Sequence, residues 1–362
     1  MSLFHSIAYR FHPAFLLLLF CLWPHQAATA QDNAQEDSTY ARARIGASPR
    51  KKHGKALNLI WKADSILTLR YRRIKTDTLY VIRPATKWVI KTRGNLSGIS
   101  MYMRGMARGN KYSAYIQSDV KGTLNIAVGY LGLSVGVSVN PASWAGKYKD
   151  YEFNLNSYSN RWGIDLVYHN QQSAGGWMRR EGQKQEEIPH GSVLSKTASL
   201  NAYMAFNHKR FSFPAAFSQS YIQRRSAGSW LLGLSLMWQR IESGHTIDAD
   251  ITVSKLNSLN VAIGAGYGYN FAMRRQWLLH LSALPTLVVW NKNELWDGNS
   301  WHKEQMHVPD VIVAGRMALV KNYKRNFMGA SLIFNFSALG ESDRLRIHTT
   351  KWRARLFYGW RF

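Results

Sequence analysis

The sequence predicts an all-β protein: a transmembrane antiparallel β-barrel of about 12 strands, range 10–14, with a short periplasmic N-terminal segment. Three observations predict this class. Apolar and polar residues alternate with a period of two along many segments, aromatic residues make up 13% of the chain, and the last stretch is aromatic on one face and cationic on the other. A lipid-facing barrel wall explains all three, because its strands alternate apolar outside with polar inside and carry aromatic girdles.

The stretch from Leu345 to Phe362 has the clearest two-faced pattern. One face carries Trp352, Ala354, Leu356, Tyr358, Trp360 and Phe362, and the opposite face carries Lys351, Arg353, Arg355 and Arg361. We expect the apolar face to lie in lipid and the basic face in the lumen. Tyr358, Trp360 and Phe362 resemble the assembly signal of outer-membrane barrels. The alternative is an ordinary amphipathic strand of a soluble sheet.

Residues 1–30 have the pattern of a secretory signal peptide. Arg10 precedes the apolar run Ala14–Trp23, and Ala28-Thr29-Ala30 provides a small-residue cleavage site. The run is too short to span a bilayer as a helix. Cys21, the single cysteine, lies within it, so we expect a mature chain with no disulfide or thiolate metal site. Export to the outer membrane of a bacterial cell follows as the expected localisation.

Internal segments repeat the alternation, notably Trp230–Trp238, Leu259–Phe271 and Met328–Phe336. Their second faces are rich in glycine, serine and asparagine, which would give a soluble sandwich no packed core. These faces are therefore expected to line a lumen.

Connections of alternating length set the expected topology, with short turns at one end and longer loops at the other. The count of 12 places a short turn at Val120–Gly122 and treats Thr123–Asn140 as one long strand with a bulge. The barrel domain is predicted to cover residues 87–362.

Two segments do not have the residue pattern of a simple strand. Residues 31–86 form a basic periplasmic segment, in which Ala56–Tyr71 has helical spacing. Phe211–Arg225 contains Pro214, which argues against a central strand. We expect that segment at the periplasmic rim or folded into the lumen.

The same region carries a resemblance. The runs Lys209–Gln219 and Gln223–Ser229 look like the central block of a Bacteroidota outer-membrane barrel family, catalogued as domain of unknown function four thousand four hundred and twenty-one. Asp77–Val81 with Pro84, and Gly266-Tyr267-Gly268-Tyr269, match it as well. The resemblance covers roughly residues 77–362. It implies an outer-membrane location and no activity, substrate or catalytic residue.

The basic residues expected in the lumen suggest a function. Arg316, Lys351, Arg353 and Arg355 are placed on inner faces, and cationic rings favour anionic solutes. We therefore expect a non-enzymatic barrel, either a narrow pore for anionic solutes or a structural, envelope-binding barrel. In the second case these cations would pair with Asp165 and Glu152, which the same alternation turns inward.

The alternative function is an outer-membrane lipid hydrolase. His280 and Ser282 flank Leu281 on one strand, so both side chains point to one face. An imidazole at that spacing can take the proton of a serine hydroxyl. Outer-membrane phospholipases use a His-x-Ser pair with a supporting asparagine, but no neighbouring motif identifies the third residue here. The alternation turns the pair inward, and two polar lumen residues are the simpler interpretation.

Other partners follow from composition and export. The chain has a formal net charge of +26, yet export removes nucleic acid as a partner, and the basic segment has no nucleic-acid-binding motif. Outer-membrane lipids, lipopolysaccharide and the barrel-assembly machinery are the expected partners. We expect no cofactor and no metal, because the histidines are scattered and no phosphate-binding loop is present.

Overall fold

The computed structural model describes residues 75–107, 110–130, 133–139, 151–243, 255–296, 301–304, 310–341 and 345–362, together with Ser65, Thr68 and Leu69. The strands are β1 (Val81–Ile82), β2 (Trp88–Ala107), β3 (Asn110–Gln117), β4 (Lys121–Tyr130), β5 (Leu133–Val139), β6 (Tyr151–Tyr158), β7 (Trp162–Arg180), β8 (Glu186–Ala205), β9 (Ile222–Gln223), β10 (Ala227–Ser243), β11 (Lys255–Met273), β12 (Trp277–Trp296), β13 (Trp301–Glu304), β14 (Val311–Asn322), β15 (Asn326–Glu341) and β16 (Leu345–Arg361). Within these ranges, no helix has both the length and the apolar character needed to cross a membrane.

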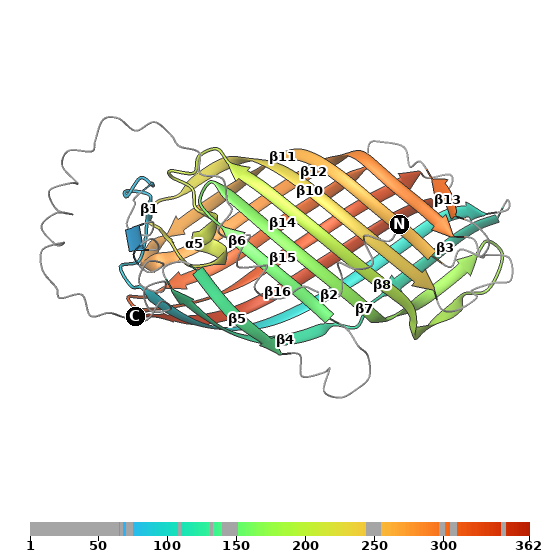
Figure 1. Ribbon diagram of the computed structural model, residues 1–362, viewed down its shortest axis with the longest axis horizontal. Helices are drawn as coiled ribbons and strands as arrows, with labels where there is room; N and C mark the ends of the chain where they lie inside the picture. The colour runs from blue at the N-terminus through green and yellow to red at the C-terminus, as the bar shows by residue number, and fades with distance from the viewer. Residues whose placement is uncertain are drawn as a thin grey trace, which may run out of the picture. The chain divides into compact units, whose positions relative to one another are not determined.

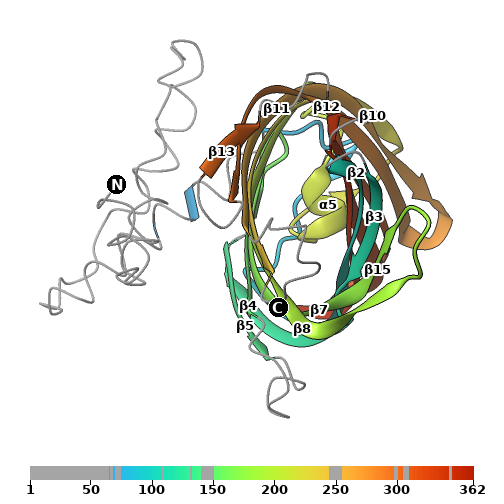
Figure 2. The ribbon, with the colours of Figure 1, turned by 90° about the vertical axis from the view of Figure 1, so that its right-hand side faces the viewer.

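The long strands form one antiparallel sheet that closes on itself. The order runs from β16 through β15, β14, β12, β11, β10, β8 and β7 to β3 and β2, and β2 pairs back with β16. That closing pair is long, from Val89 opposite Arg361 to Gly105 opposite Leu345. Figure 1 shows the slanted strands, and Figure 2 shows the ring from one end. The predicted fold class, an antiparallel β-barrel, is confirmed.

One part of the predicted strand pattern is wrong. Thr123–Asn140 is not one strand, because β4 and β5 form a hairpin in which Leu124 lies opposite Val139. The predicted turn at Val120–Gly122 is wrong as well. Both β3 and β4 run antiparallel to β2 on the same side, so the chain continues in one direction there. The two errors compensate in the strand count. Within the described ranges the sheet has 14 strands, of which β3 and the short β13 lie in the other half of the barrel, so 12 strands cross the half that contains β4, β5 and β6.

Alternation places side chains inside or outside the wall. On the outer face Leu356 is 69% exposed and Trp230 is 65% exposed, whereas on the inner face Arg361 is 1% and His280 is 0% exposed. Outward aromatic residues gather where strands begin or end at the end of the barrel that contains Trp88, which we call the plug end: Trp88, Trp162, Phe206, Trp230, Phe271, Tyr323, Trp360 and Phe362. Such a girdle is typical of a barrel wall at a membrane interface.

Within the connection between β8 and β10, residues 206–226, the middle part, residues 211–219, folds into the plug end of the lumen. We call the whole connection the plug, and residues 224–226 at its end are exposed. Its helix α5 (Phe213–Phe217) lies inside the ring of strands (Figure 2). Ser212 is the N-cap, since its hydroxyl accepts a hydrogen bond from the Ala215 amide at 3.3 Å, and Pro214 occupies the first turn, where no amide proton is needed. Of the two positions expected for Phe211–Arg225, the structure shows the lumen for residues 211–219, whereas Arg224 and Arg225 are exposed.

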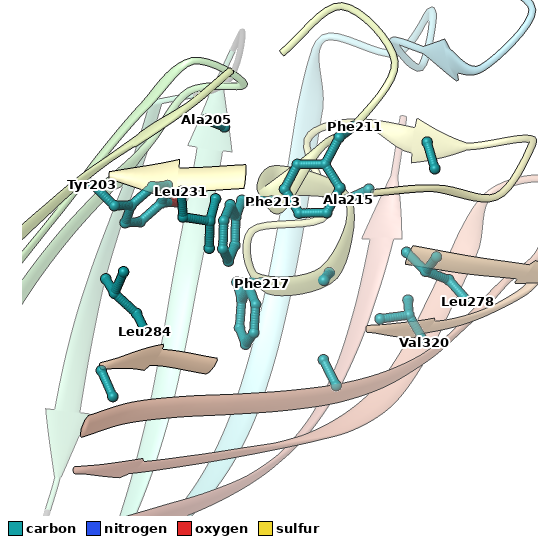
Figure 3. Packing of buried hydrophobic residues seen from close by; sticks show 14 of the residues in the cluster. Tyr203, Ala205, Phe211, Phe213, Ala215, Phe217, Leu231, Leu278, Leu284 and Val320 are labelled. Carbon is teal, nitrogen blue, oxygen red and sulfur yellow. The ribbon is translucent and has the colours of Figure 1, made fainter. Parts of the chain in front are cut away.

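The plug builds the main apolar core of the described chain. Phe211 and Phe213 are fully buried, and Phe217 is 6% exposed (Figure 3). The wall residues that enclose them include Tyr203, Leu231, Leu278, Leu284 and Val320. A barrel normally fills its lumen with wall side chains or water. Here the apolar core consists of plug residues packed against the wall.

The segment before β2 is hydrogen bonded to the plug. Strand β1 pairs with β9 of the plug, Val81 opposite Gln223. The Asp77 amide donates to the Lys209 carbonyl at 2.9 Å, and the Arg210 guanidinium donates to the Asp77 carboxylate at 3.2 Å. The predicted signal peptide, most of the basic segment and the helix expected at Ala56–Tyr71 lie outside the described residues, apart from Ser65, Thr68 and Leu69.

The last strand gives a test of the inside–outside assignment. Leu356→Arg places a cation on the lipid face, where an arginine near the midplane costs about 2–4 kcal/mol. Arg355→Leu removes an inward side chain whose Nε donates to Asn95 Oδ1 at 2.7 Å. We expect Leu356→Arg to reduce the folded, heat-modifiable fraction far more than Arg355→Leu does. Equal assembly of the two variants would contradict the assignment.

Candidate functional site: an asparagine–histidine–serine array beneath the plug

Three polar side chains meet on the inner faces of two neighbouring strands. His280 and Ser282 lie two residues apart on β12, so both point into the lumen. Asn270 lies on β11 directly opposite His280 in the strand register. Cross-strand partners on one face have neighbouring Cβ atoms, so the fold brings these three side chains into contact.

The array is hydrogen bonded end to end. Asn270 Oδ1 lies 2.7 Å from His280 Nδ1, and His280 Nε2 lies 2.9 Å from Ser282 Oγ. The Asn270 amide nitrogen donates to the Ser212 carbonyl at 2.9 Å and to Gln223 Oε1 at 3.0 Å.

These contacts assign the proton positions. Because the amide nitrogen of Asn270 is used by two acceptors, its oxygen faces the histidine, and a carbonyl oxygen only accepts. His280 Nδ1 therefore carries the proton. In a neutral imidazole Nε2 is then an acceptor, and the Ser282 hydroxyl donates to it. This is the arrangement in which an imidazole can act as a base toward a serine.

Aromatic rings of the plug cover the histidine. The ring centroid of His280 lies 4.9 Å from that of Phe213, 5.1 Å from that of Phe217 and 5.9 Å from that of Phe211. Gly268 makes room for this packing, since a Cβ there would stand 3.0 Å from the Phe211 ring and 3.2 Å from the Ser282 Cβ. His280 is fully buried, whereas Ser282 is partly exposed.

Gln223 connects the array to the backbone of the plug. Its amide nitrogen donates to the carbonyls of Arg210, at 2.6 Å, and Arg225, at 2.9 Å. Its oxygen accepts from the Ser212 amide at 3.1 Å as well as from Asn270. The chain of hydrogen bonds from the plug backbone through Gln223, Asn270 and His280 to Ser282 therefore satisfies polar groups that burial would otherwise penalise.

A buried ion pair lies beside the array, since Arg316 on β14 is directly opposite Ser282 in the strand register. Arg316 Nη2 donates to Asp165 Oδ2 at 2.7 Å, and the Tyr158 hydroxyl donates to the same carboxylate. The Arg316 guanidinium also lies 5.2 Å from the Tyr203 ring centroid and 5.7 Å from that of Phe213. Arg316 thus takes part in the closed packing, as in the structural alternative drawn from the sequence. The side chain of Glu152 lies outside the described residues.

Two cations of the wall bind the end of the plug helix. Lys91 Nζ donates to the Ser218 carbonyl, and Arg361 Nη2 donates to the Gln219 carbonyl at 3.0 Å and to Asn322 Oδ1 at 2.9 Å. Cations suit the carbonyl end of a helix.

The other basic residues predicted for the lumen lie on the inner face of β16. Lys351, Arg353 and Arg355 are partly exposed there. Arg316 and these three are the residues predicted to line a pore. The contacts of Lys91 and Arg361 with the plug were not predicted from the sequence.

The aromatic residues predicted as an assembly signal lie on the outer face or at the edge of the wall. Trp360 is 52% exposed and Phe362 is 56% exposed. The backbone of Phe362 forms two hydrogen bonds with that of Trp88, at 2.8 and 3.0 Å, which extends the closing pair of strands. Their role in assembly stays a prediction. Within the described ranges, no three histidine, cysteine or acidic residues gather as metal ligands.

Sequence reasoning missed Asn270 and Gln223. The alternation of Leu259–Phe271 predicts an inward side chain for Asn270, but it does not show which residue of β12 lies opposite. That relation depends on the register of two long strands joined by a three-residue helical turn, Arg274–Gln276.

The fold and the site define a plugged antiparallel β-barrel with a hydrogen-bonded polar array beneath the plug. The chain belongs to the family described as "Domain of unknown function (DUF4421)", whose pattern matches residues 75–362. This confirms the predicted family. No curated protein sequence matches the chain.

Several solved outer-membrane barrels are similar in fold, all at low identity. The outer membrane protease OmpT from Escherichia coli is 8% identical, with a TM-score of 0.41, covering 77% of this chain and 97% of that one. The translocator domain of the autotransporter NalP from Neisseria meningitidis is 10% identical, with a TM-score of 0.30, covering 90% and 98%. The β domain of the Bordetella autotransporter BrkA is 11% identical, with a TM-score of 0.33, covering 75% and 100%.

The array predicts that Asn270 helps to hold the plug. Asn270→Ala removes the hydrogen-bond acceptor of His280 Nδ1–H and the donor to the Ser212 carbonyl and to Gln223 Oε1. Each buried polar group left unsatisfied costs about 1–3 kcal/mol. A cysteine introduced at Ala216, which is fully buried in α5, reports on plug release. We expect Asn270→Ala to increase the rate of its maleimide labelling.

Asn260→Ala is the matched control. Asn260 is on the same strand, faces inward and is 1% exposed, but it bonds to Ser258 Oγ at 2.8 Å and not to the plug. Its labelling rate should equal that of the Ala216→Cys parent. Equal rates for the Asn270 and Asn260 variants would mean that the array does not stabilise the plug.

Proposed function

We propose that this protein is an outer-membrane barrel that is closed at rest by its own plug, with a non-enzymatic role in the envelope. The observation that carries the proposal is the packing of Phe211 and of α5, with Phe213 and Phe217, into the lumen. An open pore for anionic solutes would need that space to contain water.

Three features support the membrane placement. The outer face of the wall is apolar, aromatic residues gather at the plug end, and the N-terminal sequence has the pattern of a signal peptide. In this placement the plug end faces the periplasm. Outer-membrane lipids and lipopolysaccharide would surround the wall, and the barrel-assembly machinery would insert it.

The hydrogen bonding of the plug supports the closed state. Lys91 and Arg361 donate to carbonyls at the end of α5, and Gln223 and Asn270 bond backbone groups of Ser212 at its start. Removing the plug would leave several buried polar groups without partners, so opening carries a substantial free-energy cost.

The second candidate function is hydrolysis of an ester such as a lipid. The observation that favours it is the Asn270–His280–Ser282 array, which supplies the supporting asparagine that the sequence did not identify. Ser282 Oγ would attack the ester carbonyl while His280 Nε2 takes its proton and returns it to the departing alcohol. Water would then release the acid from the acyl-serine. The array lies under the plug, so this reaction requires the plug to move.

Conductance tests the closed state. We expect the wild-type protein in planar bilayers to show no steady conductance. Replacing residues 211–219 by a glycine–serine stretch of equal length should produce a steady open channel, because the apolar core of the lumen is gone. A glycine–serine replacement of the exposed turn 181–185 is the control and should behave as wild type.

Heat-modifiable gel mobility establishes that each variant is folded. Steady conductance of the folded wild-type protein, equal to that of the plug variant, would refute closure by the plug.

A fluorophosphonate probe separates the two candidate functions. If the array is catalytic, the plug variant should be labelled and the same variant with Ser282→Ala should not be. Ser235→Ala, which changes an inward serine bonded to Asn201, is the control and should leave labelling intact. If neither wild type nor plug variant reacts, the hydrolase candidate is excluded and the array serves only to hold the plug.

A further inference from the structure

The inner faces of β2 and β16 place three cations together. Lys91 and Arg93 lie two residues apart on β2, and Arg355 lies opposite Asn95 on β16. We call these three residues the cationic cluster. Lys91 lies within electrostatic range of Arg93, Arg355 and Arg361. Arg355 lies within range of Arg93 and Arg353, and also of the negative charge of Asp165. Like charges this close in a partly buried site repel each other.

The partners of the cluster in the described part of the chain are neutral. Lys91 donates to the Ser218 carbonyl, and Arg355 donates to Asn95 Oδ1. None of the three forms an ion pair with a described acid. The acid that faces them across the lumen, Asp165, is already paired with Arg316 at 2.7 Å and bonded to Tyr158.

We propose that the cationic cluster binds a phosphate group and that this binding loosens the plug through Lys91. The inference rests on the proposed closed barrel. It adds the ligand that the barrel binds and the contact through which this ligand loosens the plug. Three neighbouring cations that form no ion pair with an acid of the described residues leave a local excess of positive charge in a site of reduced dielectric constant. An anion that fills the site removes this repulsion.

Phosphate fits the cluster better than a carboxylate does. A phosphate monoester carries about −1.5 to −2 charges at pH 7, against −1 for a carboxylate, so it neutralises more of the cluster. Arginine guanidinium groups form paired hydrogen bonds with phosphate oxygens. The inward side chains of Arg93, Asn95 and Arg355 are partly exposed, so water and small solutes reach them.

Lys91 links the site to the plug. It is 5% exposed, and its ammonium group bonds the Ser218 carbonyl, directly after α5. An ammonium group interacts more strongly with a phosphate oxygen than with a neutral carbonyl. A phosphate bound by Arg93 and Arg355 therefore competes with Ser218 for Lys91, while the Arg361 contact to Gln219 remains.

The binding test uses the purified full-length mature protein in detergent, in a phosphate-free buffer, with inorganic phosphate as the probe in calorimetry. We expect wild type to bind and the double variant Arg93→Gln/Arg355→Gln to bind at least about tenfold more weakly, since each lost charged hydrogen bond is costly. Arg104→Gln is the matched control, because Arg104 is on the same strand and exposed on the outer face. It should bind as wild type.

Two further probes identify the source of the phosphate. Tighter binding of glycerol 3-phosphate than of short-chain phosphatidic acid supports a soluble phosphorylated ligand, and the reverse order supports a lipid headgroup. Wild type that binds no phosphate, or a double variant that binds equally well, overturns the proposal.

The coupling has its own readout. In the Ala216→Cys protein, phosphate should raise the rate of maleimide labelling several-fold, and in the double variant it should have no effect. Phosphate binding without any change in labelling overturns the coupling. The conductance experiment separates this inference from closure itself: a wild-type barrel that is closed but does not bind phosphate refutes the cluster alone, and one that conducts steadily refutes the plug.

Discussion

The closing pair of β2 and β16 is the constraint on which the rest of the structure depends. Once the ring is closed, each strand residue faces either lipid or lumen. A one-residue shift in the register of a strand would turn each of its side chains to the opposite face of the wall. The register that places Arg355 inside and Leu356 outside also aligns Lys91, Arg93 and Arg361 along one inner wall. A closed ring has no free edge along this pair, so the lumen becomes the place for polar chemistry.

The plug is held by polar contacts at both ends of a short apolar helix. At its start, Gln223 and Asn270 bond backbone groups of Ser212, and at its end two wall cations bond carbonyls. Phe213 and Phe217 of the helix, together with the preceding Phe211, pack around His280. Each contact is modest alone, but satisfied buried networks stabilise one arrangement because partial loss leaves groups unpaired. A plug of this kind is suited to two states, fully seated or displaced.

The sequence was sufficient for the fold class and for the facing of the strands, because a period of two is a local property. It failed where local pattern does not record direction. The alternation slips near Tyr130, and a slip fits a bulge in one long strand as well as the hairpin between β4 and β5 that the structure shows. The interruption after Gln117 likewise fits a turn, although the chain continues in one direction there. The pairing of Asn270 with His280 depends on cross-strand register, and the position of Phe211–Arg225 depends on what fills the lumen. Neither is encoded by spacing within one segment.

Hydrogen–deuterium exchange of the mature protein in lipid nanodiscs tests the central claim, that the plug is packed inside the closed barrel, most directly. The amides of the plug are bonded within the barrel, as in Phe211 to the Asn207 carbonyl at 2.9 Å and Ser218 to the Pro214 carbonyl at 3.2 Å. Peptides covering residues 211–219 should therefore exchange slowly, on the timescale of β11 in the barrel wall. Exchange of those peptides at the rate of an unstructured chain, with β11 still protected, would contradict the account.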